Sequence, residues 1–216
     1  YAHLPHIFKP QRRIAEADLP AAAAKLDILS NTIERLGEAG YQFIGMDHFA
    51  KPDDELAIAQ REGKLHRNFQ GYSTQAECDL LAFGISSIGK VDDCYSQNVR
   101  TLDEYYAALD SGHLPVLRGL RLDQDDLLRR ELIGELMCQF NLDTKRFAGQ
   151  HQIDFQTYFK KEIEELKDLE KAGLLEWREE DIYVPIKGRL LARRVAMTFD
   201  RHLRESQAKG TYSKVL

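Results

Sequence analysis

The sequence has 216 residues, of which 43% are apolar and 30% are charged, with only 6 prolines and 14 glycines. This composition is typical of a folded globular chain and excludes the disordered and fibrous classes of protein. No stretch approaches the roughly 18 apolar residues of a membrane-spanning helix, and a net charge of −5 argues against a dedicated nucleic-acid binder.

Residues 1–115 are predicted to form alternating helices and buried strands. Leucine and isoleucine recur at helical spacing through residues 26–36, and Gly40 ends this helix just before a short apolar strand at 41–46. A helix that passes directly into an apolar strand is typical of a parallel sheet or barrel. The other elements predicted here are a helix from Pro52 to Arg61, a buried strand over 79–88 and a helix over 102–109.

The pattern changes near residue 115, so we predict a second, mostly helical domain over 116–216 and a boundary within 112–122. Asp123 and Asp126 stand where they would cap a helix that carries an apolar stripe. Helices followed by a two-stranded wing are typical of a winged-helix domain. The predicted elements are helices over 123–140, 159–173 and 188–204, with strands at 174–177 and 182–184 before the last helix.

The three cysteines, Cys78, Cys94 and Cys138, are far apart in the sequence. An odd number at such spacing is typical of reduced thiols, and together with the lack of a visible secretory signal it predicts a cytoplasmic protein. None of the spacings suits zinc or an iron–sulfur cluster, so we expect this chain to hold no metal by itself.

Two short segments carry candidate site residues. Asp47 and His48 follow the strand predicted at 41–46, where the loops of a parallel barrel converge on the active site. The alternative is a capping aspartate beside a partly buried histidine. The loop 68–74 combines aromatic, amide and glycine residues, which could approach a ligand closely or could form a simple surface turn.

No nucleophile elbow, phosphate-binding loop, Rossmann glycine pattern or HExxH helix is present, which excludes those enzyme classes. The basic stretch 187–214 could be a nucleic-acid face. However, Arg189, Arg193 and Arg194 flank apolar residues, as on the solvated face of an amphipathic helix, and we favour that interpretation. A non-enzymatic winged-helix module that binds nucleic acid or protein is the alternative function.

Four long segments closely resemble the C-terminal half of bacterial oxygen-independent coproporphyrinogen III oxidases, a family of radical S-adenosylmethionine enzymes of haem biosynthesis. The resemblance implies an α/β fold. Residues 1–115 would be the C-terminal strands and helices of a partial (β/α) barrel, and residues 116–216 a small winged-helix-like domain. The segments are YAHLPHIFKPQRRI (1–14), YQFIGMDHFAKPDDELAIAQREGKLHRNFQGYST (41–74), DLLAFGISSIGKVDDCYSQN (79–98) and VPIKGRLLARRVAMTFDRHLR (184–204).

The family's activity is the oxidative decarboxylation of two propionates of coproporphyrinogen III to vinyl groups, which gives protoporphyrinogen IX by a 5′-deoxyadenosyl radical mechanism. The resemblance implies S-adenosylmethionine and a 4Fe-4S cluster as cofactors, coproporphyrinogen III and an unknown electron acceptor as partners, and no nucleic acid. The family's cluster-binding cysteine motif is absent from this sequence. We therefore expect a C-terminal piece of a longer enzyme that is inactive alone.

The resemblance assigns a few positions one by one. Ala2 and Ile88 match contacts to the cluster-bound S-adenosylmethionine, and Phe69 and Gln70 match a pair at a second S-adenosylmethionine. Asp47 and His48 would stand beside the substrate cavity, with no catalytic role assigned to any residue. By location alone, the candidates to hold the substrate carboxylates are Arg12, Arg13, Arg61 and Arg67.

Overall fold

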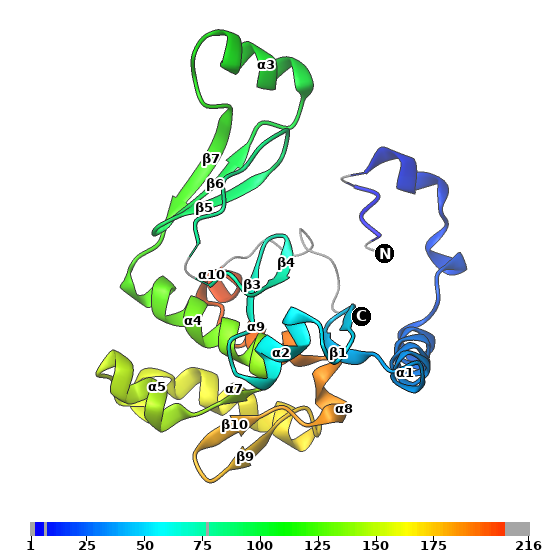
Figure 1. Ribbon diagram of the computed structural model, residues 1–216, viewed down its shortest axis with the longest axis vertical. Helices are drawn as coiled ribbons and strands as arrows, with labels where there is room; N and C mark the ends of the chain where they lie inside the picture. Colours follow the sequence, from blue (N-terminus) through cyan, green and yellow to red (C-terminus); the bar gives the residue numbers. More distant parts are fainter. Residues whose placement is uncertain (1–2, 7, 77, 206–216) are drawn as a thin grey trace.

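The computed structural model describes residues 3–6, 8–76 and 78–205 of the chain, drawn as a ribbon in Figure 1. Helices alternate with four small antiparallel sheets among these residues, which confirms the α/β class. None of the helices in this described part is long and apolar enough to cross a membrane.

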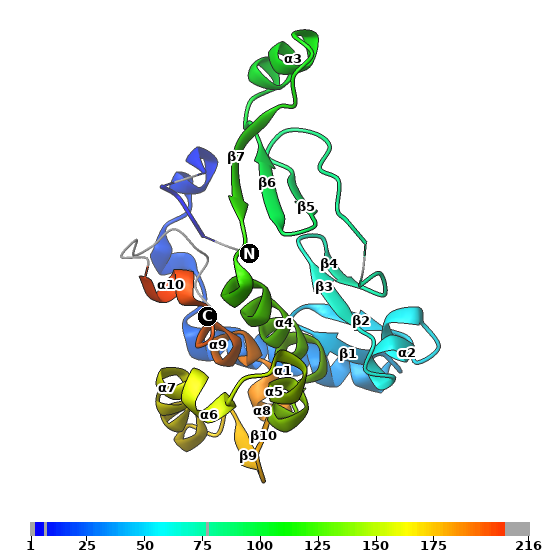
Figure 2. The same ribbon diagram turned by 90° about the vertical axis from the view of Figure 1, so that its left-hand side faces the viewer.

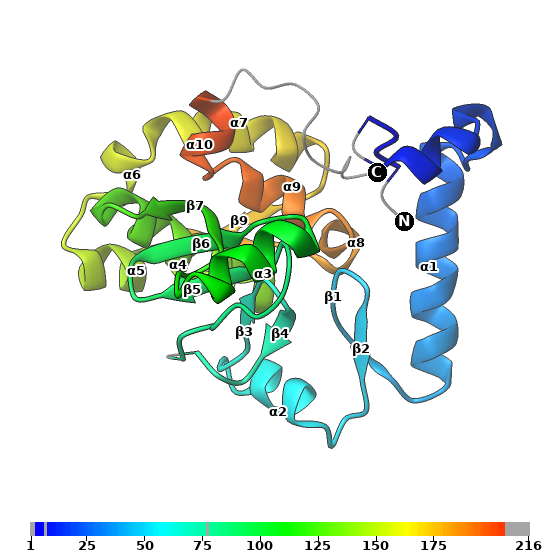
Figure 3. The ribbon, with the colours of Figure 1, turned by 90° about the horizontal axis from the view of Figure 1, so that it is seen from above.

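The first long helix matches its prediction. After two short 3-10 helices (Lys9–Arg13 and Glu16–Asp18), α1 spans Ala22–Glu38. Its predicted apolar stripe is half-buried, and Gly40 ends the helix with φ +79°. Figure 3 shows α1 at the edge of the molecule, beside the hairpin of β1 (Gln42–Gly45) and β2 (His48–Ala50).

Strand β1 pairs antiparallel with β2, so the parallel partner that the helix-to-strand step predicts is not among the described residues. Asp54 caps the next helix, α2 (Glu55–Arg61), by accepting a hydrogen bond from the Leu56 amide, and the helix thus begins three residues after Pro52. A second hairpin follows, formed by β3 (His66–Asn68) and β4 (Gly71–Ser73).

A three-stranded sheet forms an arm that projects from the rest of the molecule (Figures 1 and 2). The strand order is β5–β6–β7, and α3, which was predicted over 102–109, connects β6 to β7. Because β7 pairs with β6, the first strand after the predicted boundary is tied to the preceding segment; the division at 115/116 stays a prediction. The bounds are β5 Ile88–Val91, β6 Cys94–Asn98, α3 Leu102–Asp110 and β7 Val116–Arg121.

The buried strand predicted over 79–88 is wrong. Leu80 makes one isolated bridge to Lys90, and the chain then forms a loop in which Phe83 is 80% exposed. Gly84 at φ +92° turns the backbone out of an extended path. The buried amide of Asn98 donates to the carbonyls of Ala82 (3.3 Å) and Gly84 (2.9 Å), so the loop is held by a side chain instead of a strand ladder.

The C-terminal part has the helix, strand and wing order that its sequence predicts. Asp123 and Asp126 form a reciprocal capping box at the start of α4, and Gly173 ends α7 at φ +73°. Phenylalanine and leucine side chains from its first four helices form one core that includes Leu132 and Phe159. The elements are α4 Gln124–Gln139, β8 Asn141–Leu142, α5 Thr144–His151, α6 Phe155–Tyr158, α7 Lys160–Lys171, β9 Glu176–Arg178 and β10 Asp181–Tyr183.

The single basic helix predicted over 188–204 is wrong, because this segment forms three short helices. They are α8 (Ile186–Arg189), α9 (Ala192–Met197) and α10 (Arg201–Glu205). Arg194 is exposed as expected, but Arg189 and Arg193 are half-buried. The solvated-face interpretation therefore holds for one of the three arginines only.

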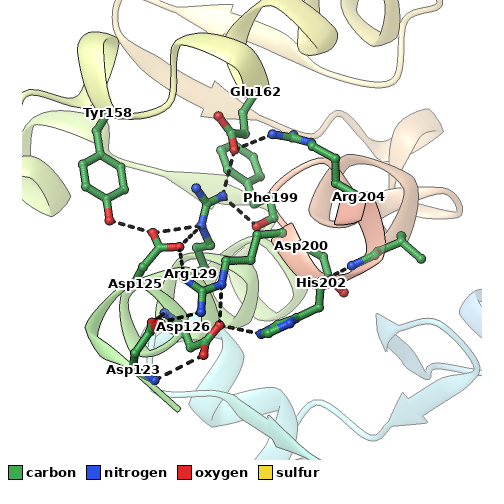
Figure 4. Close-up of polar contacts among 12 residues, drawn as sticks. Asp123, Asp125, Asp126, Arg129, Tyr158, Glu162, Phe199, Asp200, His202 and Arg204 are labelled. Atoms are coloured by element: carbon green, nitrogen blue, oxygen red, sulfur yellow. Dashed lines mark hydrogen bonds and ion pairs between the residues drawn. The ribbon is translucent and has the colours of Figure 1, made fainter. Parts of the chain in front are cut away.

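An ion-pair network fastens α10 to α4 and α7 (Figure 4). Glu162 on α7 is 2% exposed and accepts from Arg129 Nη1 at 2.8 Å and Arg204 Nη1 at 2.9 Å. Arg201 pairs with Asp123, Asp125 and Asp126 at 2.6–2.9 Å. The network therefore fixes the chain on the C-terminal side of α9.

We expect this network to make the fold sensitive to acid. Burial raises the pKa of Glu162, but the hydrogen bond and charge of Arg129 outweigh it and hold the pKa below its ordinary value. The hydrogen bond from Arg201 likewise lowers the pKa of Asp123. A carboxyl whose pKa is lower in the folded state stabilises the fold above its unfolded pKa, and this stability is lost as pH falls below about 4. Urea titrations at several pH values measure the free energy of unfolding, which should fall with pH less steeply in Glu162→Gln than in the wild type. An equal dependence on pH in the two proteins would contradict the assignment.

Candidate functional site

Two hairpins meet at the turn that carries Asp47 and His48. The Asp47 Oδ1 and His48 Nδ1 atoms lie 2.9 Å apart, and the His48 ring meets the Tyr72 ring edge-on at 5.1 Å. Gly71 permits this contact, because a Cβ atom there would lie 2.9 Å from His48 Nε2. The structure thus places Asp47 and His48 against β4, next to the loop that the sequence analysis singled out.

A cavity of about 300 Å³ opens beside this turn. Its walls come from α1, the β1–β2 turn, β4, α4 and the α8–α9 segment, so residues far apart in sequence converge on it. Apolar side chains form much of the wall. The lining residues with polar or aromatic groups are Asp47, Tyr72, Phe140, Arg189 and Arg193.

Tyr72 lines the cavity, and its hydroxyl is a neutral hydrogen-bond donor. Its hydroxyl donates to the Met137 carbonyl at 3.2 Å, and burial raises its pKa well above the ordinary value. Cys138 lies nearby and is buried, which raises its pKa to about 12. Both groups are therefore uncharged at neutral pH.

The described residues do not fit an iron–sulfur cluster. Cys138 is buried and protonated, whereas Cys78 and Cys94 are exposed at other places in the fold. Across residues 3–6, 8–76 and 78–205, no three His, Cys, Asp or Glu side chains are grouped so that they could hold a metal ion. Any cluster used together with this chain would need thiolates from elsewhere.

The tip of the β3–β4 hairpin reaches the projecting sheet. Phe69 is 52% exposed, and its ring meets the Tyr95 ring on β6 edge-on at 5.2 Å. Ile88 begins β5, the neighbouring strand of the same sheet. The Gln70 side chain is exposed and has no hydrogen-bond partner within the described part of the chain. Phe69 and Gln70 thus lie at the hairpin tip that contacts this sheet, Ile88 lies within the sheet, and Ala2 lies outside the described residues.

An exposed ring, a free amide and an apolar strand end suit a ligand with a flat base and polar groups. A phenylalanine ring can stack on such a base, and a glutamine amide can donate and accept at once. This part of the chain therefore fits S-adenosylmethionine chemically. The assignment of Ile88, Phe69 and Gln70 to that ligand stays a prediction.

Two of the four arginines that were candidates for substrate carboxylates are hydrogen-bonded within the fold. Arg61 donates to the Pro52 carbonyl at 2.6 Å and to Gln42 Oε1 at 3.0 Å, and Arg12 donates to the Pro5 carbonyl at 2.9 Å. Arg67 stands over the Tyr72 ring at 5.8 Å, while Arg13 is exposed. The sequence analysis instead passed over Arg189 and Arg193 as solvent-facing, although their four-residue spacing could have indicated a shared face.

Comparison with known proteins agrees with this architecture. Residues 122–191 match the family described as the HemN C-terminal domain. The whole chain is 50% identical over 216 residues to the oxygen-independent coproporphyrinogen III oxidase of Escherichia coli (strain K12) and covers 47% of it. It is 45% identical to the enzyme of the same name from Thermostichus vulcanus, of which it covers 66%.

The solved structure of coproporphyrinogen III oxidase from Escherichia coli, described as a radical SAM enzyme, superposes with a TM-score of 0.87 at 51% identity. The alignment covers 94% of this chain and 46% of that one. Over its whole length the chain is thus similar to the C-terminal part of oxygen-independent coproporphyrinogen III oxidases. It matches the C-terminal part of that structure and spans about half the length of most curated relatives that it matches. The match supports the predicted fold, with the corrections at 79–88 and 188–204.

Proposed function

We propose that this chain is the C-terminal part of an enzyme that oxidatively decarboxylates two propionates of coproporphyrinogen III to vinyl groups, giving protoporphyrinogen IX. The observation that carries the proposal is 50% identity over all 216 residues to an enzyme of that name. The aligned region includes the β1–β2 and β3–β4 hairpins, which carry the candidate site. We place the enzyme in the cytoplasm, and its electron acceptor is unknown.

S-adenosylmethionine and a 4Fe-4S cluster would supply the oxidising chemistry at the propionate. Within this chain, Phe69, Gln70 and Ile88 would hold S-adenosylmethionine by stacking, hydrogen bonding and apolar contact. The cluster ligands would come from the preceding part of the protein, since the described residues offer no thiolate group for it. The contribution of this chain is therefore binding, orientation and exclusion of water.

The alternative of a nucleic-acid-binding winged helix has little support in the described C-terminal segment, where Lys187 and Arg194 are exposed but the other arginines are paired or line the cavity. Arg201 and Arg204 are held in ion pairs with Asp123, Glu162 and their neighbours. Arg189 and Arg193 line the cavity instead of the surface. The arginines of this segment therefore support a ligand site better than a phosphate-binding surface.

The direct test is turnover by the intact protein that contains this chain, purified without oxygen and supplied with S-adenosylmethionine, a reductant and coproporphyrinogen III. We expect protoporphyrinogen IX, detected as fluorescent protoporphyrin after oxidation of the products. Omission of S-adenosylmethionine should abolish its formation. A cluster-loaded protein that leaves coproporphyrinogen III unchanged under these conditions would refute the proposal.

We predict that Gln70→Leu in the intact protein lowers coproporphyrinogen turnover by at least roughly tenfold. A buried polar group of the ligand that is left without its amide partner weakens binding by about 1–3 kcal/mol. A change of 1.4 kcal/mol corresponds to about a factor of ten in rate. The exposed Gln70 side chain has no described partner in the fold, so the melting temperature should not change. Gln156→Leu, at an exposed position on α6, is the matched control. Wild-type turnover by Gln70→Leu would remove Gln70 from the site.

A further inference from the structure

The cavity beside the β1–β2 turn is lined by two arginines, Arg189 and Arg193, that have no ion-pair partner in the part of the chain that the structure describes. The Arg189 guanidinium lies 4.6 Å from the Phe140 ring centroid, and its Nε atom is buried without a hydrogen-bond partner in the described part of the chain. Arg193 lines the same cavity, and neither arginine forms an ion pair among the described residues. A buried donor almost always has a partner, so the unpaired Nε indicates a missing one.

The acid in the same wall does not fill this role. Asp47 lines the cavity, but its side chain is 84% exposed and its Oδ1 atom is engaged with His48 Nδ1 at 2.9 Å. The arginines of the neighbouring segment differ in having ion-pair partners, since Arg201 and Arg204 pair with acids of α4 and α7. Arg189 and Arg193 thus have no anionic partner among residues 3–6, 8–76 and 78–205, and are available to an anion from outside this part of the chain.

The shape and lining of the cavity define that anion further. Guanidinium groups pair best with planar carboxylates, to which they can donate two parallel hydrogen bonds. The rest of the wall is mainly apolar, with Met46, Met137 and Leu190 beside the Phe140 ring. A volume of about 300 Å³ is at the lower end for small-molecule sites. It suits one ring with an acid arm, and a whole tetrapyrrole would extend out of it.

We propose that this cavity binds one propionate arm of the porphyrinogen, with Arg189 and Arg193 pairing its carboxylate and the apolar wall covering the adjoining pyrrole. This assignment rests on the proposed function. Tyr72 connects the cavity to the predicted S-adenosylmethionine residues, because it lies on β4 two positions after Gln70. The bound arm would therefore anchor the macrocycle beside the hairpin that carries the cofactor residues, and Asp47 at the rim would accept from a pyrrole N–H.

The test is binding of coproporphyrin III, the stable oxidised form of the substrate, to the intact protein, followed by porphyrin fluorescence. We expect Arg193→Gln to weaken binding about tenfold, because a hydrogen-bonded charge pair is lost. Arg193→Lys should recover part of that loss by keeping the charge. Arg194→Gln is the matched control, since Arg194 is adjacent and exposed, and it should bind as the wild type does. Arg189→Gln should behave as Arg193→Gln does if the variant folds.

Each outcome decides between the assignments. Binding by Arg193→Gln within twofold of both the wild type and Arg194→Gln would overturn the carboxylate site and leave the proposed function intact. If Arg193→Gln bound S-adenosylmethionine more weakly but coproporphyrin III as the wild type does, the substrate site would also be overturned. The carboxylate bound by the arginines would then be that of the cofactor. A wild-type protein that neither binds coproporphyrin III nor converts coproporphyrinogen III would overturn the proposed function itself.

Discussion

Replacing Glu162 with alanine is expected to lower the free energy of unfolding of the chain by about 3–5 kcal/mol, the usual cost of removing one partner from a buried ion pair. Glu162 is almost fully buried and accepts hydrogen bonds from both Arg129 and Arg204. The Arg129 side chain is 13% exposed. Without Glu162, the Arg129 guanidinium would still pair with Asp125 but would lose its ion pair with α7.

Urea unfolding followed by the fluorescence of Trp177 measures this effect directly. Trp177 is the one tryptophan in the sequence and packs against the C-terminal core. Glu164→Ala is the matched control, because Glu164 is exposed on the same helix and pairs only with Lys167 among the described residues. We expect this control to stay within about 0.5 kcal/mol of the wild type. Equal stability of the Glu162 and Glu164 variants would contradict a stabilising role for the network.

The network also connects the fold to the proposed carboxylate site. Arg201 and Arg204 follow α9 directly, and α9 carries Arg193 into the cavity. A loosened α10 would remove one of the supports of α9, whose buried face packs on the core through Ala192 and Val195. Glu162→Ala should therefore weaken coproporphyrin III binding as well, without any contact between Glu162 and the ligand.

Local chemistry made much of the fold predictable. The stripe on α1, the capping box of Asp123 and Asp126, and the glycines at positions 40 and 173 depend on contacts within one helix or one turn. Such contacts are visible in a sequence because all partners lie within a few residues. The wing of β9 and β10 was found for the same reason, since two short strands flank one acidic turn.

The misjudged segments depend on distant partners. The apolar run at 79–88 has the composition of a buried strand, but Asn98 holds it as a loop from 14 to 16 positions away. The segment 188–204 has helical periodicity, but its two ends pack against distant partners: Gly188 lies against the Leu174 backbone, and Arg201 and Arg204 pair with acids of α4 and α7. The cavity arginines were missed because the residues that bury them come from α4 and the hairpins. The resemblance placed Asp47 and His48 beside a substrate cavity; Asp47 lines the cavity described above, and the role of both residues stays a prediction.

Gly188→Ala is expected to lower the free energy of unfolding by about 3 kcal/mol, at the upper end of the cost of overpacking a core. A Cβ atom at this position would lie 2.3 Å from the Leu174 carbonyl oxygen and 3.0 Å from its carbonyl carbon. Both are backbone atoms at the start of the wing, so they cannot move aside as a flexible side chain could. The backbone angle at Gly188 is an ordinary one, so the penalty would come from the close contact alone.

Gly134→Ala separates this steric effect from the general effect of replacing glycine in a helix. Gly134 lies within α4, and a Cβ atom there would meet nothing within 4 Å. Alanine should therefore stabilise the chain by about 0.5–1 kcal/mol at this position. Calorimetry should show that Gly188→Ala melts roughly 6–12 °C below the wild type, since a loss of 1 kcal/mol corresponds to about 2–4 °C at this chain length. Two variants that melt together would mean that α8 can move away from Leu174 at little cost. The position of Arg189 at the end of α8 would then not be fixed by this contact.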